Sequence, residues 1–71
     1  MNGSRVDWSV ERVRALGVTT DLITAGAVLG IGRTTAYTLA RAGRFPVPVM
    51  KAGARYVVGV AHLLRAIGVD S

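Results

Sequence analysis

Glycine limits how long any helix in this chain can be. Gly17, Gly30, Gly43 and Gly68 each follow a short run in which apolar residues recur at helical spacing. Glycine is the common residue just past the end of a helix, because it adopts the left-handed backbone conformation without steric cost. The spacing of these glycines therefore predicts four short helices in place of one long one.

The chain has 71 residues and no cysteine, so disulfides and thiolate zinc sites cannot support its core. A chain of this size buries only about 60% of the surface that its unfolded form exposes. Hydrophobic residues make up 51% of the sequence, which is enough for one thin core. We expect an N-terminal extension with a short helix, residues 1–17, and one folded domain, residues 18–71.

Three of the predicted helices have an apolar stripe, and two of them also have a recognisable N-cap. The first begins after the N-cap Ser9 and places Val10, Val13 and Leu16 on one side. The second begins after the N-cap Asp21, runs from Leu22 to Leu29, and has the stripe Leu22, Ala25, Val28 and Leu29. The last runs from Val60 to Ile67, with Val60, Leu64 and Ile67 facing inward.

The remaining helix, residues 33–42, follows the second after only Gly30-Ile31-Gly32. One of its faces is suited to close packing and consists of Ala36, Leu39, Ala40 and Gly43. The opposite face carries hydrogen-bonding groups, one aromatic ring and one cation: Thr34, Tyr37, Thr38 and Arg41. Two short helices joined by a glycine-containing turn predict a helix-turn-helix, which presents its second helix to a DNA major groove about 12 Å wide.

After residue 45 the pattern changes from helical to extended. Prolines at positions 46 and 48 exclude a helix, and two β-prone runs, 47–50 and 56–58, flank a turn that contains glycine. We expect a β-hairpin with a cation at each shoulder, Lys51 and Arg55. These cations either protect an edge strand from pairing or form a wing that binds phosphate or the minor groove; we prefer the wing.

The charge balance favours a polyanionic partner. The net charge is +5 and the pI is about 11.2. From Thr24 to the C-terminus the only acid is Asp70, whereas the same stretch carries Arg33, Arg41, Arg44, Lys51, Arg55 and Arg65. Such an excess is typical of proteins that bind nucleic acid. The alternative is a helix face that is merely solvated, but such a face more often carries Glu, Gln and Lys than Thr.

Over residues 21–67 the chain resembles the small excisionases of phages and plasmids, also called recombination directionality factors, which are related to the MerR-like winged helix. The shared motifs are Leu29-Gly30-Ile31, Arg33, Thr35-Ala36-Tyr37, Leu39, Arg41-Ala42-Gly43, Phe45-Pro46 and Arg55-Tyr56. The resemblance implies a winged helix-turn-helix, mainly α with a small β-hairpin wing. The chain departs from the family at Gly32, where a Ser or Thr cap is usual, at Thr38, where arginine is frequent, and in a longer wing.

The resemblance further implies sequence-specific binding to attachment-site DNA, with several copies of the protein side by side. It also implies that the bound protein directs a prophage integrase toward excision. The residues expected to contact double-stranded DNA are Arg33, Thr34, Thr35, Tyr37, Thr38, Arg41, Arg44, Lys51 and Arg55. Two alternatives stay open. One is a small transcriptional regulator that binds an operator, and the other is a protein-interaction module that acts on the integrase through Trp8 and the first helix.

The residues do not favour an enzyme, a cofactor or a metal site. His62 is the only histidine, and the carboxylates of Asp7, Glu11, Asp21 and Asp70 are scattered along the chain. Gly30-Ile31-Gly32 lies between two predicted helices and not after a strand, which argues against a dinucleotide site. The longest charge-free run, residues 22–32, is much shorter than the about 20 residues of a membrane-spanning helix, so we expect a cytoplasmic protein.

Overall fold

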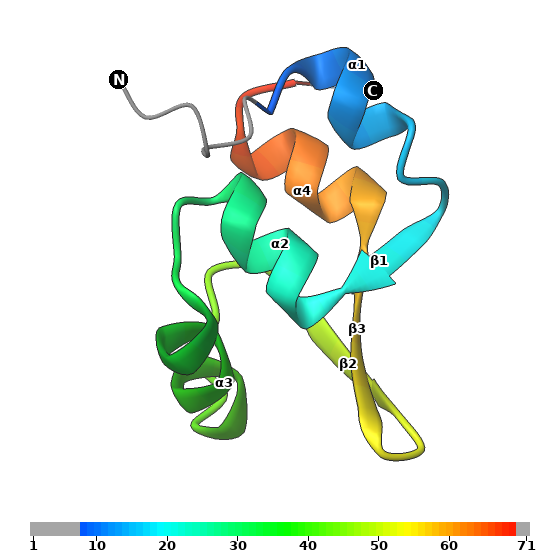
Figure 1. The fold of residues 1–71 in the computed structure, drawn as a ribbon. Coiled ribbons are helices and arrows are strands. Elements are labelled where there is room, and N and C mark those ends of the chain that lie inside the picture. Colours follow the sequence, from blue (N-terminus) through cyan, green and yellow to red (C-terminus); the bar gives the residue numbers. More distant parts are fainter. Residues whose placement is uncertain (1–7, 70–71) are drawn as a thin grey trace.

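The computed structural model describes residues 8–69, which form four helices and a three-stranded antiparallel sheet (Figure 1). In chain order the elements are α1 (Val10–Arg14), β1 (Thr19–Asp21), α2 (Leu22–Val28), α3 (Arg33–Arg41), β2 (Val49–Ala52), β3 (Arg55–Gly59) and α4 (Val60–Ala66). The strand order in the sheet is β1-β3-β2. None of the helices in this described part is long and apolar enough to cross a membrane.

The predicted N-caps of the first two helices are confirmed. The Ser9 hydroxyl accepts a hydrogen bond of 3.1 Å from the backbone N–H of Arg12. Asp21 Oδ1 accepts one of 2.7 Å from the backbone N–H of Thr24. Each cap satisfies a first-turn donor that has no partner within its own helix, so both helices start where the sequence predicts.

The four glycines that are expected to end the helices all have positive φ angles, 102° at Gly17, 77° at Gly30, 69° at Gly43 and 92° at Gly68. After α2, α3 and α4, the two residues beyond the C-cap donate back into the last turn, which is the Schellman pattern. Each of these three helices ends one residue earlier than predicted, because its expected last residue is the C-cap: Leu29, Ala42 and Ile67.

The core is built by side chains from both ends of the chain. Its largest fully buried members are Val13, Leu22, Val58 and Leu63, which come from α1, α2, β3 and α4. Burial of each such side chain contributes about 1.5–3 kcal/mol. Because α1 packs on α4 and buries Val13, the segment from Trp8 onward shares this core (Figure 1).

One predicted core position of α4 is wrong. The periodicity places Ile67 inward, but 37% of this residue is exposed, whereas Leu63 is 0% exposed. Ile67 is the C-cap of the helix, which ends at Ala66. Val69 packs against the core in its place, since the Schellman turn brings its backbone N–H to within 2.8 Å of the Leu64 oxygen.

The strand β1 is an element that the sequence pattern does not predict. It pairs antiparallel with β3, with Thr20 opposite Val58, so that β3 becomes the central strand. A strand of three residues is too short for an apolar–polar alternation to be visible. β1 runs directly into α2 and thereby attaches the start of α2 to the sheet.

The predicted hairpin is confirmed and consists of β2 and β3. Ala52 pairs with Arg55, so the loop contains only Gly53 and Ala54. Gly53 has φ 64° and Ala54 does not have a positive φ, which fits a type II′ turn. Directly paired residues share one face of a sheet, so Lys51 lies on the face of Tyr56 and Arg55 on the opposite face.

Candidate nucleic-acid interface

The helix α3 is attached to α2 through a contact between two small residues. Ala36 is 0% exposed and is the buried residue of α3. A Cβ atom built on Gly26 of α2 would lie only 3.2 Å from the Cβ of Ala36. Because this contact is so narrow, α3 packs closely while it extends away from α1 and α4, alongside the β2–β3 hairpin (Figure 1).

The exposed surface of α3 carries most of the residues predicted to contact DNA. Its exposed members are Arg33, Thr34, Thr35, Thr38 and Arg41, and Arg44 is exposed in the loop that follows. The Thr38 hydroxyl donates a hydrogen bond of 3.0 Å to the backbone oxygen of Thr34. This bond uses the hydroxyl proton, so the oxygen of Thr38 is left to accept from an outside donor.

Tyr37 does not lie on the outer face on which the helical pattern places it. Its side chain is half-buried and packs against the core. The centroid of its ring lies 6.1 Å from that of Tyr56 in β3, and the two rings are tilted by 57°. Tyr37 directly follows the buried Ala36, and its ring lies toward the hairpin. The structure thus places the ring of Tyr37 between the backbone of α3 and the hairpin.

The two cations of the hairpin have different surroundings, although both are exposed. Lys51 Nζ lies 5.6 Å from the centroid of the Tyr56 ring, within the range of a cation–π contact. Arg55 is close enough to influence Asp21 on β1. Hydrogen bonds from Thr24 lower the pKa of the Asp21 carboxyl below its ordinary 3.8 against the effect of burial, and the charge of Arg55 lowers it further. Lys51 thus lies beside an aromatic ring, whereas Arg55 lies in the neighbourhood of an acid.

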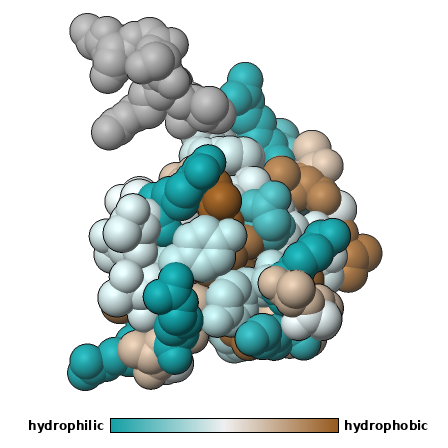
Figure 2. All heavy atoms as spheres, turned by 60° about the horizontal axis from the view of Figure 1, so that its bottom comes forward, coloured by the Kyte–Doolittle hydropathy of each residue, from teal (hydrophilic) through white to brown (hydrophobic). Residues whose placement is uncertain are grey.

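The end of the molecule formed by α3 and the hairpin is turned forward in Figure 2. Hydrophilic side chains project from it at several separate places, with nearly neutral surface between them and hydrophobic surface only in small patches (Figure 2). Such a surface, with separated cations and hydroxyl groups, suits contact with phosphates and base edges more than it suits an apolar partner.

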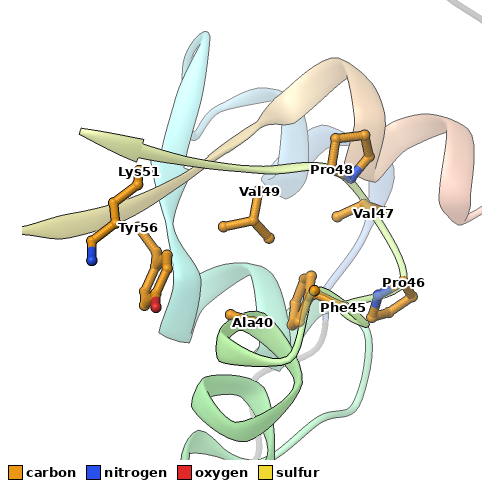
Figure 3. Close-up of a pocket in the computed structure, with 9 residues that line it drawn as sticks. Ala40, Phe45, Pro46, Val47, Pro48, Val49, Lys51 and Tyr56 are labelled. Atoms are coloured by element: carbon orange, nitrogen blue, oxygen red, sulfur yellow. The ribbon is translucent and has the colours of Figure 1, made fainter.

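An open groove of about 340 Å³ separates the end of α3 from β2 (Figure 3). Its lining is mainly apolar and consists of Ala40, Gly43, Phe45, Pro46, Val47, Pro48, Val49, Lys51 and Tyr56. Figure 3 shows Lys51 and Tyr56 at one side of this groove, and Phe45 and Pro46 at the other. The helix and the hairpin are therefore two distinct projections.

His62 lies apart from these two projections, on α4 (Figure 1). It is half-buried, and its Cδ2 is 3.1 Å from the position that a Cβ on Gly59 would occupy. Within residues 8–69, the His, Cys, Asp and Glu side chains form no group of three or more that could hold a metal ion.

Two residues belong to the geometry of the interface but are not among the predicted contacts. Tyr56 is the neighbour of both Tyr37 and Lys51, and Asp21 lies near Arg55. In the sequence, Tyr56 is visible only as part of an Arg-Tyr motif and Asp21 only as an N-cap. Their roles depend on the strand register, which the sequence pattern does not give.

Comparison with known proteins finds no matching family model, no matching curated protein and no matching solved structure.

Proposed function

We propose that this protein is an excisionase, a recombination directionality factor with a winged helix-turn-helix fold that binds attachment-site DNA and directs a phage integrase toward excision. In this proposal α2 and α3 are the helix-turn-helix, α3 is the recognition helix, and the β2–β3 hairpin is the wing. The observation that carries it is the common direction of α3 and the hairpin, which present exposed cations from the same end of the molecule (Figure 1).

The size and the polar groups of α3 support a major-groove contact. The helix has nine residues and a length of about 14 Å at 1.5 Å per residue. Its diameter with side chains, about 10–12 Å, fits a groove about 12 Å wide. Arg33 lies in its first turn, where recognition helices contact base edges, and its guanidinium matches the two acceptors of guanine. Arg41 in the last turn and Arg44 after it are suited to the phosphates that flank the groove.

The hairpin supports a second contact with the same duplex. A wing beside a recognition helix reaches the neighbouring minor groove or its phosphates, and Lys51 supplies the cation for it. Arg55 is the weaker candidate, because it lies on the face of the sheet opposite to that of Lys51 and Tyr56.

DNA binding is tested by selection from a pool of random DNA duplexes with the full chain at physiological salt. The selected duplex and a scrambled duplex of equal composition are then compared by fluorescence anisotropy. We expect the selected duplex to bind at least about a thousand times more tightly. Equal affinities, or no binding to either duplex, would overturn sequence-specific DNA binding.

The choice among the functions needs a second experiment. For an excisionase, the selected sequence occurs in the attachment DNA of an integrated element, and the protein stimulates excision and suppresses integration by the integrase of that element in a purified reaction. For a transcriptional regulator, the sequence occurs at a promoter and recombination is unchanged. For a protein-interaction module, the protein binds the integrase but not the DNA.

A further inference from the structure

We propose that Tyr37 is a positioning residue: through its contact with Tyr56 it holds the β2–β3 hairpin at a fixed angle to α3, so that both bind one duplex at the same time. This inference rests on the proposed DNA binding. It gives Tyr37 a different role from the direct DNA contact that the sequence pattern suggests.

The first argument is where the tyrosine pair lies between α3 and the hairpin. The backbone of α3 packs against α2, and an open groove separates the end of α3 from β2. A second open groove of about 330 Å³ lies between the start of α2 and the hairpin, and both tyrosines line it. Tyr37 and Tyr56 meet between these two grooves, with their ring centroids 6.1 Å apart. The tyrosine pair is thus a direct side-chain contact between the two projections, beside the apolar contacts of Ala40 and Val49 with the core.

The second argument is that the contact continues to the wing cation. Tyr56 is half-buried and stands directly opposite Lys51 in the sheet. Lys51 Nζ lies 5.6 Å from the centroid of the Tyr56 ring. Tyr37, Tyr56 and Lys51 therefore form one chain of contacts that runs from the recognition helix to the cation of the wing. Removal of the Tyr37 ring takes away one of the contacts that hold Tyr56 and, through it, Lys51.

The third argument is that the contact between Tyr37 and Tyr56 depends on the ring of Tyr37 and not on its hydroxyl group. Packing of tilted aromatic rings requires the ring but not the hydroxyl group. Tyr37→Phe therefore keeps the contact with Tyr56, whereas Tyr37→Ala removes it. A tyrosine that contacts DNA through its hydroxyl shows the opposite pattern, because Phe and Ala then both lose the contact.

The test measures the affinity of the full chain for its selected duplex over a range of salt concentrations. For Tyr37→Ala we expect a loss of affinity of about threefold to tenfold, the size of an aromatic pair's contribution. We also expect a salt slope that is less steep by about one, because the wing no longer holds its phosphate. Tyr37→Phe is the matched control and keeps both the affinity and the slope. The salt slope distinguishes the positioning role of Tyr37 from a direct DNA contact, because a neutral side chain that touches DNA directly releases no counterions.

A Lys51→Ala background provides the second arm of the test. There Tyr37→Ala leaves the slope unchanged, because the phosphate contact that it would remove is already absent. The proposal is overturned if Tyr37→Phe loses as much affinity as Tyr37→Ala, or if Tyr37→Ala keeps the wild-type slope.

A measurement without DNA separates this inference from the proposed function. Residual dipolar couplings of the backbone amides report the angle between α3 and the hairpin in the free protein. We expect this angle to change in Tyr37→Ala and to stay the same in Tyr37→Phe. If the alanine variant does not fold, Tyr37→Leu takes its place, because it keeps apolar bulk but not the ring. An unchanged angle overturns the positioning role, whereas failure of the wild-type protein to bind DNA overturns only the proposed function.

Discussion

The backbone of Ile31 lies against Gly26 through two of its atoms. The Ile31 N–H donates a hydrogen bond of 2.7 Å to the Gly26 carbonyl oxygen, and the Ile31 carbonyl oxygen lies 3.0 Å from the position that a Cβ on Gly26 would occupy. Ile31 is the second residue after the C-cap of α2, so this contact forms part of the turn that leads into α3. The lack of a side chain at position 26 therefore allows the close contact that sets the position of α3 relative to α2.

Gly26→Ala is expected to destabilise the protein although alanine is the better helix former. The new methyl group meets the backbone oxygen of Ile31, which cannot move without shifting the turn, and the Cβ of Ala36 at 3.2 Å. Overpacking of this kind costs about 1–3 kcal/mol, against a gain in helix propensity of about 1 kcal/mol. Urea unfolding of both proteins measures the net loss of stability.

Gly32→Ser is the matched control for this prediction. Gly32 has φ −70°, and a Cβ at this position meets no atom within 4 Å. Gly32 is the N-cap of α3 but makes no side-chain cap hydrogen bond, which a serine at this position would supply. The free energy of unfolding is therefore expected to rise by a few tenths of a kcal/mol, roughly the difference between a serine and a glycine N-cap. A Gly26→Ala variant as stable as the wild-type protein would show that the turn is not tightly packed.

Helix ends were predictable in this chain because their signals are local. Ser9 and Asp21 cap the helices that follow them, and Gly30, Gly43 and Gly68 lie directly after the C-caps of α2, α3 and α4. A capping side chain or a glycine with positive φ acts within a few residues of its own position, so a single sequence reveals it. The hairpin was predictable for the same reason, since Gly53 begins a two-residue turn.

The features that could not be predicted depend on contacts between elements. β1 exists because β3 lies beside it, and Lys51 and Arg55 lie on opposite faces because of the strand register. Tyr37 follows the pattern of the outer face of α3, yet its ring turns to Tyr56, which lies 19 positions later in the chain. The pattern within one helix cannot show what stands beside it in space.

A steep salt dependence is expected for DNA binding. If Arg41, Arg44, Lys51 and Arg55 make about four phosphate contacts, the logarithm of the binding constant falls against that of the salt concentration with a slope near −4. Fluorescence anisotropy over a salt series measures this slope. Arg65→Ala serves as a control, because Arg65 is exposed on α4, away from α3 and the hairpin. A slope between zero and about −1 would contradict a phosphate footprint of this size.

Arg33 and Lys51 are expected to act differently on specific and random DNA. Arg33→Ala removes a base contact, so it costs about 1–3 kcal/mol on the selected duplex and relaxes the preference for one base pair. Lys51→Ala removes a phosphate contact and weakens all duplexes alike. Affinities of both variants for the selected duplex, its single-base variants and a scrambled duplex check this. If both variants lose affinity equally on every duplex, Arg33 does not read a base.

The Asp21 cap makes stability depend on pH. The pKa of Asp21 is lowered in the folded protein, so the unfolded chain binds the proton more tightly. The stabilisation is therefore complete above the ordinary value of 3.8 and is lost as the pH falls through the lower pKa of the folded state.

Two substitutions at position 21 test this dependence. At pH 7, Asp21→Ala is expected to cost about 1 kcal/mol, whereas Asp21→Asn keeps a capping oxygen and costs less. The deficit of Asp21→Ala shrinks in acid, where the wild-type carboxylate is protonated. Urea unfolding at neutral pH and in acid measures the deficit. An equal deficit at both pH values would show that the charge of Asp21 does not stabilise the fold.

Several copies are expected to bind side by side on DNA. The single recognition helix has nine residues and covers only a few base pairs, too few to select one site from a genome. Adjacent copies lengthen the sequence that is read, and contact between them makes binding cooperative. Trp8 is half-buried against the core, so residues 1–7, which lie outside the described part of the chain, are the part of the N-terminal extension to test.

The test is a titration on duplexes that carry one, two or three copies of the selected site. Contact between neighbours is expected to raise the affinity per site by about tenfold, equivalent to about 1.4 kcal/mol. Deletion of residues 1–7 is expected to reduce this gain and to leave binding to the single site unchanged, since α3 and the hairpin are intact. The duplex with a single site is therefore the internal control. Equal affinity per site on all three duplexes would show that the copies bind independently, and a gain that survives the deletion would place the contact elsewhere on the protein.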